Sequence, residues 1–289
     1  MTRGLDLRAR LSRKAIDELR ARSPSEPDAL WRLASLCRQA GELSSAQEAL
    51  ERIPPAQRTP AARRMLAILA REPLPGPAHA SGCQPAPFAL RDGFLDERHS
   101  EELGRLVQDR RNEFAPGKVY TPDHQKQPVV AETARTSLVL SSPDDVAEWL
   151  LPRVRDEVEA ALPVLGLPQF GLFDTEIHIS GSGNADRLRC HQDVRPHPAP
   201  QRRVSYVYYF HVGRRAFQGG DFLLYDTDVA EDRWNPAAYT RIEPLHNRLL
   251  LFGGHTYHEV TEVQCDPERW ESRRFAVCGW FRESVTDPA

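Results

Sequence analysis

The chain has 289 residues, 40% of them hydrophobic, and a formal net charge of −3. This length predicts either one generous domain or one large domain with a small one beside it. The basic residues are scattered, which argues against nucleic acid as a partner. No apolar run approaches the roughly 20 residues that span a bilayer, and five cysteines without CxxC spacing suit a reducing cytosol. We therefore expect a soluble, cytoplasmic protein without a membrane partner.

Residues 1–72 predict a small all-α segment, because apolar side chains recur there at spacings of three and four. Residues 5–22 and 59–71 each suit one helix. Between them, residues 26–55 resemble one tetratricopeptide-like helix-turn-helix unit, with the small Ala34 and Ala46 placed where two helices approach. Solenoid repeats normally need at least three units for stability. The segment therefore either packs against the rest of the chain or forms a site for a protein partner.

Residues 73–85 are rich in Pro and Gly and lack periodicity, which predicts a linker to a second domain at residues 86–289. Helices are expected from about residue 97 and over residues 143–161. From residue 172 the pattern changes to short β-rich runs separated by turn residues. These runs indicate an antiparallel sandwich or barrel, so the fold class is α+β.

The motif RCHQDV places His191 and Asp193 two residues apart. In an extended segment both side chains point to the same face, so one imidazole and one carboxylate lie together. These are two of the three ligands of a 2-His-1-carboxylate iron site, which leaves open positions on the metal. An HxD motif alone is more often a solvated surface pair. A further strand, however, begins with His258 and offers a third ligand.

The last β-rich run, RRFAVCGWF, alternates between two faces and places Arg274 on the same face as Ala276, Cys278 and Trp280. An arginine in line with small residues is well placed to reach into a cavity. Its guanidinium is the side chain best matched to a carboxylate, because it offers a planar pair of donors and stays charged. Arg274 is therefore a candidate for binding a carboxylate of a small ligand.

In order and kind, these motifs resemble the prolyl 4-hydroxylase-like branch of the Fe(II)/2-oxoglutarate-dependent oxygenases over roughly residues 86–283. The matching segments are HQD, VSYVYYFHV, GGDFLLYD, HEV and RFAVCGWF. The resemblance implies a double-stranded β-helix (jelly-roll) core with buttressing helices. It also implies Fe(II) bound by His191, Asp193 and His258, and 2-oxoglutarate held at its far carboxylate by Arg274 and Tyr209.

Three assignments have competitors in the sequence. His255 lies three residues before His258 and is an alternative ligand, although the HEV context favours His258. The spacing from His258 to Arg274 is longer than the family shows, which leaves Arg269 and Arg273 as alternatives for the co-substrate. A tyrosine that the family often has before HQD is missing, so the contact from that segment falls to either Ser180 or His178.

The resemblance implies a non-haem dioxygenase that uses 2-oxoglutarate and dioxygen, with ascorbate as a possible reductant, to hydroxylate an unactivated C–H bond. The expected substrate is a prolyl or other aminoacyl residue of a peptide or protein, or an amino-acid-derived small molecule. Desaturation and cyclisation stay open. The alternative is a helical-repeat adaptor whose jelly-roll domain binds metal without catalysis, and succinate formation would separate the two.

Overall fold

The computed structural model describes residues 2–74, 82–121, 124–129, 136–194 and 201–283, which fall into two compact units. The first unit comprises Met1–Pro87, Pro163–Leu167 and Leu223–Ile242. The second comprises Phe88–Leu162, Pro168–Phe222 and Glu243–Ala289. The division into residues 1–72, 73–85 and 86–289 stays a prediction, and residues 75–81 of the predicted linker lie outside the described residues.

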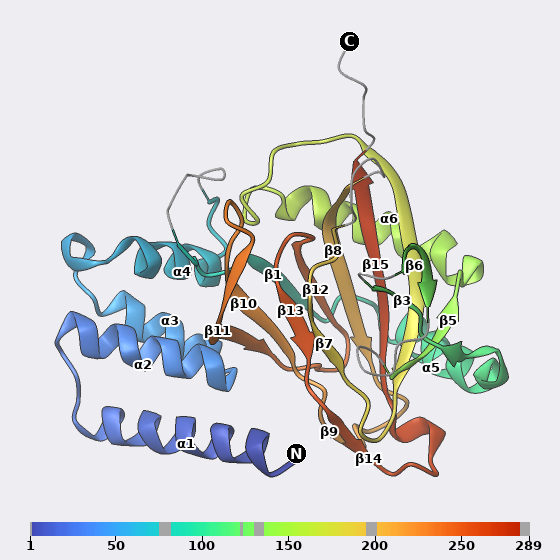
Figure 1. The fold of residues 1–289 in the computed structure, drawn as a ribbon, viewed down its shortest axis with the longest axis horizontal. Helices are drawn as coiled ribbons and strands as arrows, with labels where there is room; N and C mark the ends of the chain where they lie inside the picture. The colour runs from blue at the N-terminus through green and yellow to red at the C-terminus, as the bar shows by residue number, and fades with distance from the viewer. Residues whose placement is uncertain (1, 75–81, 122–123, 130–135, 195–200, 284–289) are drawn as a thin grey trace. The chain divides into compact units, whose positions relative to one another are not determined.

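Helices dominate the first unit (Figure 1). They are α1 (Thr2–Ala21), α2 (Pro27–Ala40), α3 (Leu43–Glu51) and α4 (Pro60–Ala70), with a short 3-10 turn η1 (Pro55–Gln57) before α4. Pro27 starts α2 at a position where no backbone donor is needed, and Gly41 ends it in the left-handed conformation (φ 83°). Consecutive helices pack on one another. The stripe that they bury comprises Leu30, Leu33, Ala34, Cys37, Ala46, Ala49, Leu50, Met65 and Ile68.

Two strands complete this unit, β10 (Phe222–Asp228), which enters it at Leu223, and β11 (Arg233–Ile242). Helix α2 packs on β11, and Arg38 of α2 forms a buried two-point ion pair with Asp226 of β10. The N-terminal helices therefore share a packed, partly charged interior with a strand pair from the C-terminal half of the sequence.

The second unit is built on a seven-stranded sheet in which every pairing is antiparallel. The strands lie in the order β1 (Phe88–Asp92), β12 (Arg248–Gly253), β8 (Gln201–Phe210), β15 (Arg274–Glu283), β6 (Leu172–Ser182), β5 (Leu138–Ser141) and β2 (Ala115–Pro116). Two two-stranded sheets accompany it: β3 (Val119–Thr121) with β4 (His124–Val129), and β9 (Phe217–Gly219) with β14 (Val263–Cys265). Strand β7 (Leu188–His191) is the edge strand of a further sheet and pairs antiparallel with β13 (His258–Val260).

The two faces of this sheet differ, and the register shows how. Tyr208 pairs with Val277 on β15, and its hydroxyl lies beside Ser100 of helix α5 (Glu97–Asp109), which packs on β8. The neighbouring Tyr209 pairs with Ala276 and points to the opposite face. Helix α6 (Asp144–Ala161) and the short turns η2 (Arg111–Glu113) and η3 (Trp270–Ser272) complete the unit. Tyr209 therefore lies on the sheet face opposite to the one on which α5 packs.

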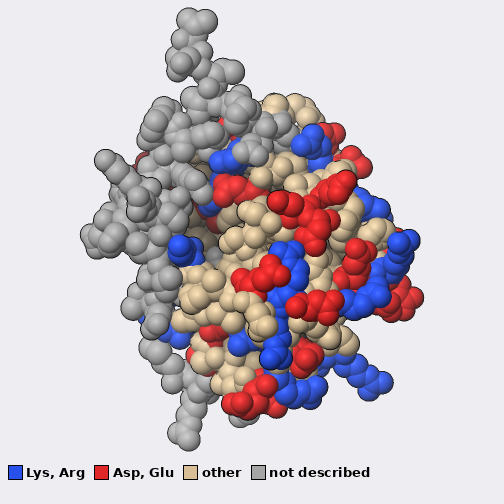
Figure 2. Space-filling view, turned by 90° about the vertical axis from the view of Figure 1, so that its right-hand side faces the viewer, with Lys and Arg blue, Asp and Glu red and all other residues tan. Residues whose placement is uncertain are grey.

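The surface turned to the viewer in Figure 2 mixes acidic and basic side chains without separating them into fields of one sign. None of the described helices is long and apolar enough to cross a membrane.

Candidate metal and co-substrate site

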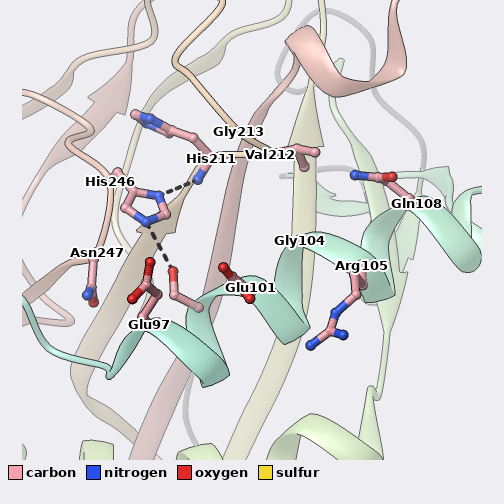
Figure 3. A pocket seen from close by; sticks show the side chains of 11 residues that line it. Glu97, Glu101, Gly104, Arg105, Gln108, His211, Val212, Gly213, His246 and Asn247 are labelled. Atoms are coloured by element: carbon pink, nitrogen blue, oxygen red, sulfur yellow. Dashed lines mark hydrogen bonds between the residues drawn. The ribbon is translucent and has the colours of Figure 1, made fainter.

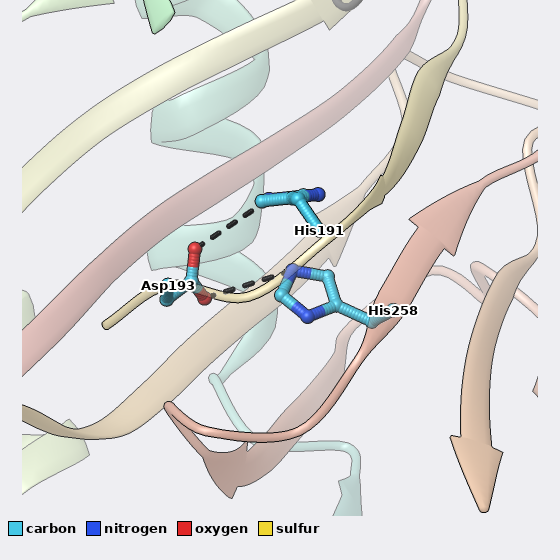
Figure 4. A group of neighbouring side chains, drawn as sticks. All are labelled: His191, Asp193 and His258. Atoms are coloured by element: carbon cyan, nitrogen blue, oxygen red, sulfur yellow. Dashed lines mark ion pairs between the residues drawn. The ribbon is translucent and has the colours of Figure 1, made fainter. Parts of the chain in front are cut away.

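Strand pairing assembles the three predicted metal ligands. His191 ends β7 and lies directly opposite His258, the first residue of β13, with the two ring centroids 4.2 Å apart. Asp193 follows two residues later, where its backbone N–H donates to the carbonyl of Gly254 at 2.9 Å. Figure 4 shows the carboxylate on one side, paired with each of the two imidazoles. Within the described ranges, these three side chains form the one group that could hold a metal ion.

The ligand atoms of this group all lie within 4.8 Å of one another. Nε2 of His191 is 3.6 Å from one oxygen of Asp193, and Nε2 of His258 is 3.6 Å from the other. His258 is almost fully buried, whereas the side chain of His191 is 33% exposed. One side of the group is therefore open to a ligand from outside.

Hydrogen bonds orient both imidazoles. Nδ1 of His191 lies 2.8 Å from the carbonyl of Arg189, and Nδ1 of His258 lies 2.9 Å from the carbonyl of Thr256. A carbonyl can only accept, so each Nδ1 carries the proton and each Nε2 keeps its lone pair. Both lone pairs face Asp193, which is the arrangement that a metal needs.

Protonation also suits metal binding. Burial lowers the pKa of His258 to about 4, which keeps its imidazole neutral at pH 7. Burial alone would raise the pKa of Asp193, but His258, His191 and Arg202 outweigh it and hold this pKa below its ordinary value. His258 and Asp193 are therefore in the forms that bind a divalent cation, a neutral imidazole and a carboxylate.

Two side chains that the sequence analysis did not identify hold Asp193 in place. Ser205 Oγ donates to Oδ2 of Asp193 at 2.7 Å, and Arg202 Nη1 donates to its backbone carbonyl at 3.3 Å. The signal for Ser205 is present in the sequence, because it precedes Tyr209 by four residues and so shares its face of β8. For Arg202 we find no comparable sequence signal.

The alternative ligand His255 is not a member of the metal-capable group among the described residues. Its backbone carbonyl instead accepts a hydrogen bond from Gln192 at 2.8 Å. The geometry therefore favours His258, as the sequence context did.

Arg274 and Tyr209 form a second polar cluster on the same unit. Both are buried, and the guanidinium carbon of Arg274 lies 4.9 Å from the centroid of the Tyr209 ring. Nε of Arg274 donates to the carbonyl of Gly220 at 2.7 Å. Within the described part of the chain, Arg274 Nη2 and Tyr209 Oη have no hydrogen-bond partner. Burial raises the pKa of Tyr209, so its phenol stays protonated and can donate.

This cluster passes a chemical test for a carboxylate. A buried donor without an acceptor costs free energy, and here two such donors lie side by side. An ionised carboxylate is an acceptor only, and a guanidinium with a neighbouring hydroxyl suits it. The residues therefore fit the far carboxylate of 2-oxoglutarate, as the resemblance implied.

The competing arginines lie elsewhere. Arg269 is exposed, and Arg273 is half-buried over the ring of Trp270, 3.9 Å from Asp186. The turn η3 accounts for the lengthened spacing, because it lies wholly before Arg274. Arg274 thus begins β15 in register with Ser182 of β6.

For the missing tyrosine, the register favours Ser180 over His178. Ser180 is buried and forms one row across the sheet with Ala276 and Tyr209. His178 lies one row further from Arg274 and contacts Trp280, with ring centroids 5.4 Å apart.

A separate surface pocket of about 570 Å³ lies beside α5 (Figure 3). His246 receives a hydrogen bond from the backbone N–H of His211 at 3.0 Å and bonds Ser100 Oγ at 3.1 Å. His211 bonds the carbonyl of Pro244 at 3.0 Å, and burial lowers its pKa to about 4. Both histidines therefore form hydrogen bonds within the fold. No member of the metal-capable group lines this pocket.

Two segments of the chain match models of known protein families. Residues 177–282 match the family model of the 2OG-Fe(II) oxygenase superfamily, and residues 10–69 match a tetratricopeptide repeat. The chain is therefore similar to a 2OG-Fe(II) oxygenase over residues 177–282 and to a tetratricopeptide repeat over residues 10–69.

The chain is also similar to hydroxylases of the prolyl 4-hydroxylase type. It is 26% identical over 206 residues to the uncharacterized PKHD-type hydroxylase sll0191 of Synechocystis sp., and the match covers 70% of this chain but 65% of that protein. The crystal structure of a Pseudomonas putida prolyl-4-hydroxylase is similar with a TM-score of 0.50 at 20% identity, covering 69% of this chain and 94% of that one. This likeness confirms the predicted α+β class and jelly-roll core.

Proposed function

We propose that the protein is an Fe(II)- and 2-oxoglutarate-dependent dioxygenase that hydroxylates an unactivated C–H bond. The observation that carries the proposal is that one unit contains both a group of potential metal ligands and a pair of buried donors without an acceptor among the described residues. Three side chains present ligand atoms within 4.8 Å of one another, and two buried donors, Arg274 Nη2 and Tyr209 Oη, lack an acceptor in the described part of the chain.

In this proposal His191, Asp193 and His258 hold the iron. Three protein ligands leave open coordination positions, which is what a co-substrate and dioxygen require. When bound, iron with 2-oxoglutarate and dioxygen supplies the oxidising chemistry, and succinate and carbon dioxide are the by-products. The protein contributes the orientation of the ligands and a dry site.

Two apolar rings exclude water from the side of the site at His258. Phe222 stacks on the imidazole of His258 with ring centroids 5.0 Å apart, and Phe252 meets it edge-on at 4.8 Å. Arg274 and Tyr209 would hold the far carboxylate of 2-oxoglutarate through two donors that are already desolvated. Because these donors are buried before the co-substrate arrives, little reorganisation is needed on binding.

For the substrate, we propose a prolyl or other aminoacyl residue of a peptide or protein, or an amino-acid-derived small molecule. The similarity to the PKHD-type hydroxylase and to the P. putida prolyl-4-hydroxylase supports this class. The tetratricopeptide-like helices are the proposed site for a protein partner. The expected location is the cytoplasm.

The test is succinate release with Fe(II), 2-oxoglutarate and ascorbate, measured across free amino acids, proline-containing peptides and lysate proteins. Mass spectrometry should then find one added oxygen in the product. Asp193→Ala serves as the blank. Iron binding without succinate in any of these mixtures would favour the alternative, an adaptor with a catalytically silent metal site.

A further inference from the structure

A glycine pair lies in the tight turn between β9 and β10. Gly219 and Gly220 both have φ of +67°, in the left-handed region that favours glycine. The N–H of Gly220 donates to the carbonyl of Glu262 at 3.2 Å, and Asp221 exchanges two hydrogen bonds of 2.9 Å with Thr261. The turn is therefore fixed to the segment that follows β13 and cannot shift freely.

This turn touches the side chain of Arg274. The carbonyl of Gly220 accepts the hydrogen bond from Arg274 Nε at 2.7 Å. A Cβ added at Gly220 would lie 2.5 Å from Cδ of the same arginine, which is closer than real Cβ contacts allow, and 3.1 Å from its Nε, which is tighter than most. Arg274 is 3% exposed, so its stem has little room to yield.

The hydrogen bond to Gly220 determines which nitrogen of the Arg274 guanidinium stays available to a ligand. Nε is committed to Gly220, while Nη2 keeps its donor beside Tyr209. A displaced stem would move Nη2 away from Tyr209 and would leave the two donors without a common acceptor position. Glycine at position 220 would thus allow the turn to form and would also keep the Arg274 side chain in position.

We propose that Gly220 is a positioning residue for the co-substrate. Its carbonyl orients Arg274, and its missing side chain leaves the space that the arginine stem occupies. This inference rests on the proposed function, since it assumes that Arg274 binds the far carboxylate of 2-oxoglutarate.

The test is titration calorimetry of Mn(II)-loaded Gly220→Ala with two ligands. 2-Oxoglutarate has the far carboxylate, whereas 2-oxopentanoate offers the same keto acid end without it. Loss of one charged hydrogen bond predicts an affinity for 2-oxoglutarate at least roughly tenfold weaker. The affinities for 2-oxopentanoate and for Mn(II) should stay within about twofold of the parent, because neither depends on Arg274.

Gly213→Ala is the matched control. Gly213 also has positive φ (+69°), but a Cβ there meets no atom of the described chain within 4 Å. It therefore carries the same backbone strain without the contact, and its affinity for 2-oxoglutarate should equal that of the parent. An equal loss in Gly213→Ala, an equal loss for both keto acids in Gly220→Ala, or no loss at all would each overturn the inference.

A double variant keeps the test decisive if Gly220→Ala does not fold. Arg274→Ala removes Cδ and Nε, including the severest contact of the new Cβ, and leaves Cγ2 of Val263 at 3.1 Å. Gly220→Ala in that background should therefore fold and bind 2-oxoglutarate as Arg274→Ala does. Failure of the double variant to fold would place the conflict in the turn itself and overturn the inference. Failure of the parent protein to bind Mn(II) and 2-oxoglutarate would instead overturn the proposed function.

Discussion

Two buried arginines, one in each unit, show opposite ways of treating the same charge. Arg38 of the first unit is 2% exposed and Arg274 of the second is 3% exposed. Both terminal nitrogens of Arg38 reach Asp226, at 2.6 and 2.7 Å. Arg274 instead bonds a backbone carbonyl through Nε, and its Nη2 has no partner among the described residues.

A guanidinium stays charged at any ordinary pH, so a buried one needs acceptors. Where the chain supplies them to both terminal nitrogens, as at Arg38, the group is structural. Where the chain leaves a terminal donor open beside another free donor, as at Arg274, a ligand from outside is the natural acceptor. Burial alone therefore does not separate the two roles. Nε of Arg38 also lacks a partner among the described residues, so the difference lies in the terminal nitrogens, which are both paired in Arg38.

The largest effect is expected at the metal group, which leaves ligand atoms unused in the same way. His258→Ala should abolish tight Fe(II) binding and turnover while the protein stays folded, because it removes one of three ligands. His255→Ala is the control and should bind iron nearly as the parent does. Anaerobic Fe(II) titration followed by a thermal melt measures both. Retained activity in His258→Ala with loss in His255→Ala would overturn the ligand assignment.

In the first unit, Arg38→Met should lower stability strongly. It leaves Asp226 buried without a partner, and breaking a buried ion pair in this way costs about 3–5 kcal/mol. Arg38→Met combined with Asp226→Leu should recover most of the loss, because no buried charge then stays unpaired. Urea unfolding monitored by circular dichroism gives the free energies of unfolding. A loss below about 1 kcal/mol in the single variant would remove the contrast between the arginines.

Arg274→Ala should show the reverse pattern, with a small effect on stability and a larger one on the co-substrate. The affinity for 2-oxoglutarate should fall at least roughly tenfold, and Arg274→Lys should recover part of it by restoring the charge without the planar donor pair. Arg269→Ala and Arg273→Ala are the controls and should behave like the parent. Calorimetric titration of 2-oxoglutarate tests this, and loss in a control but not in Arg274→Ala would contradict the assigned register.

A smaller effect is expected from Ser205→Ala. The hydroxyl only orients Asp193, and removing a partner of a metal ligand costs about tenfold in metal affinity at the lower end of the usual range. Ser205→Thr keeps the hydroxyl and should restore most of the affinity. The dissociation constant for Fe(II) is the readout. If the dissociation constant of Ser205→Ala for Fe(II) equals that of the parent, Asp193 does not need the hydrogen bond from Ser205.

Much of the fold could be predicted because periodicity is a local property. The helices expected near residues 5–22, 59–71, 97 onward and 143–161 are α1, α4, α5 and α6. Strand β11 was not predicted, because RWNPAAYTRI contains a proline and charged residues. It lies at the edge of its sheet beside β10, where a proline is tolerated.

The site divides in the same way. His191, Asp193, His258 and Arg274 stand in short motifs whose order is visible in the sequence, and the structure brings the first three together. The support of Asp193 by Ser205 and of Arg274 by Gly220 depends on how distant strands and turns meet. The ion pair of Arg38 with Asp226 joins residues 188 positions apart, and no local pattern announces such a contact.

A crystal structure with Mn(II) and 2-oxoglutarate, using the anomalous signal of manganese, would locate both ligands at once. We predict one strong anomalous peak bound by His191, Asp193 and His258. We also predict the far carboxylate of 2-oxoglutarate within hydrogen-bond distance of Arg274 Nη2 and Tyr209 Oη. A metal peak that excludes any of the three ligands, or a carboxylate bound away from Arg274, would contradict these predictions.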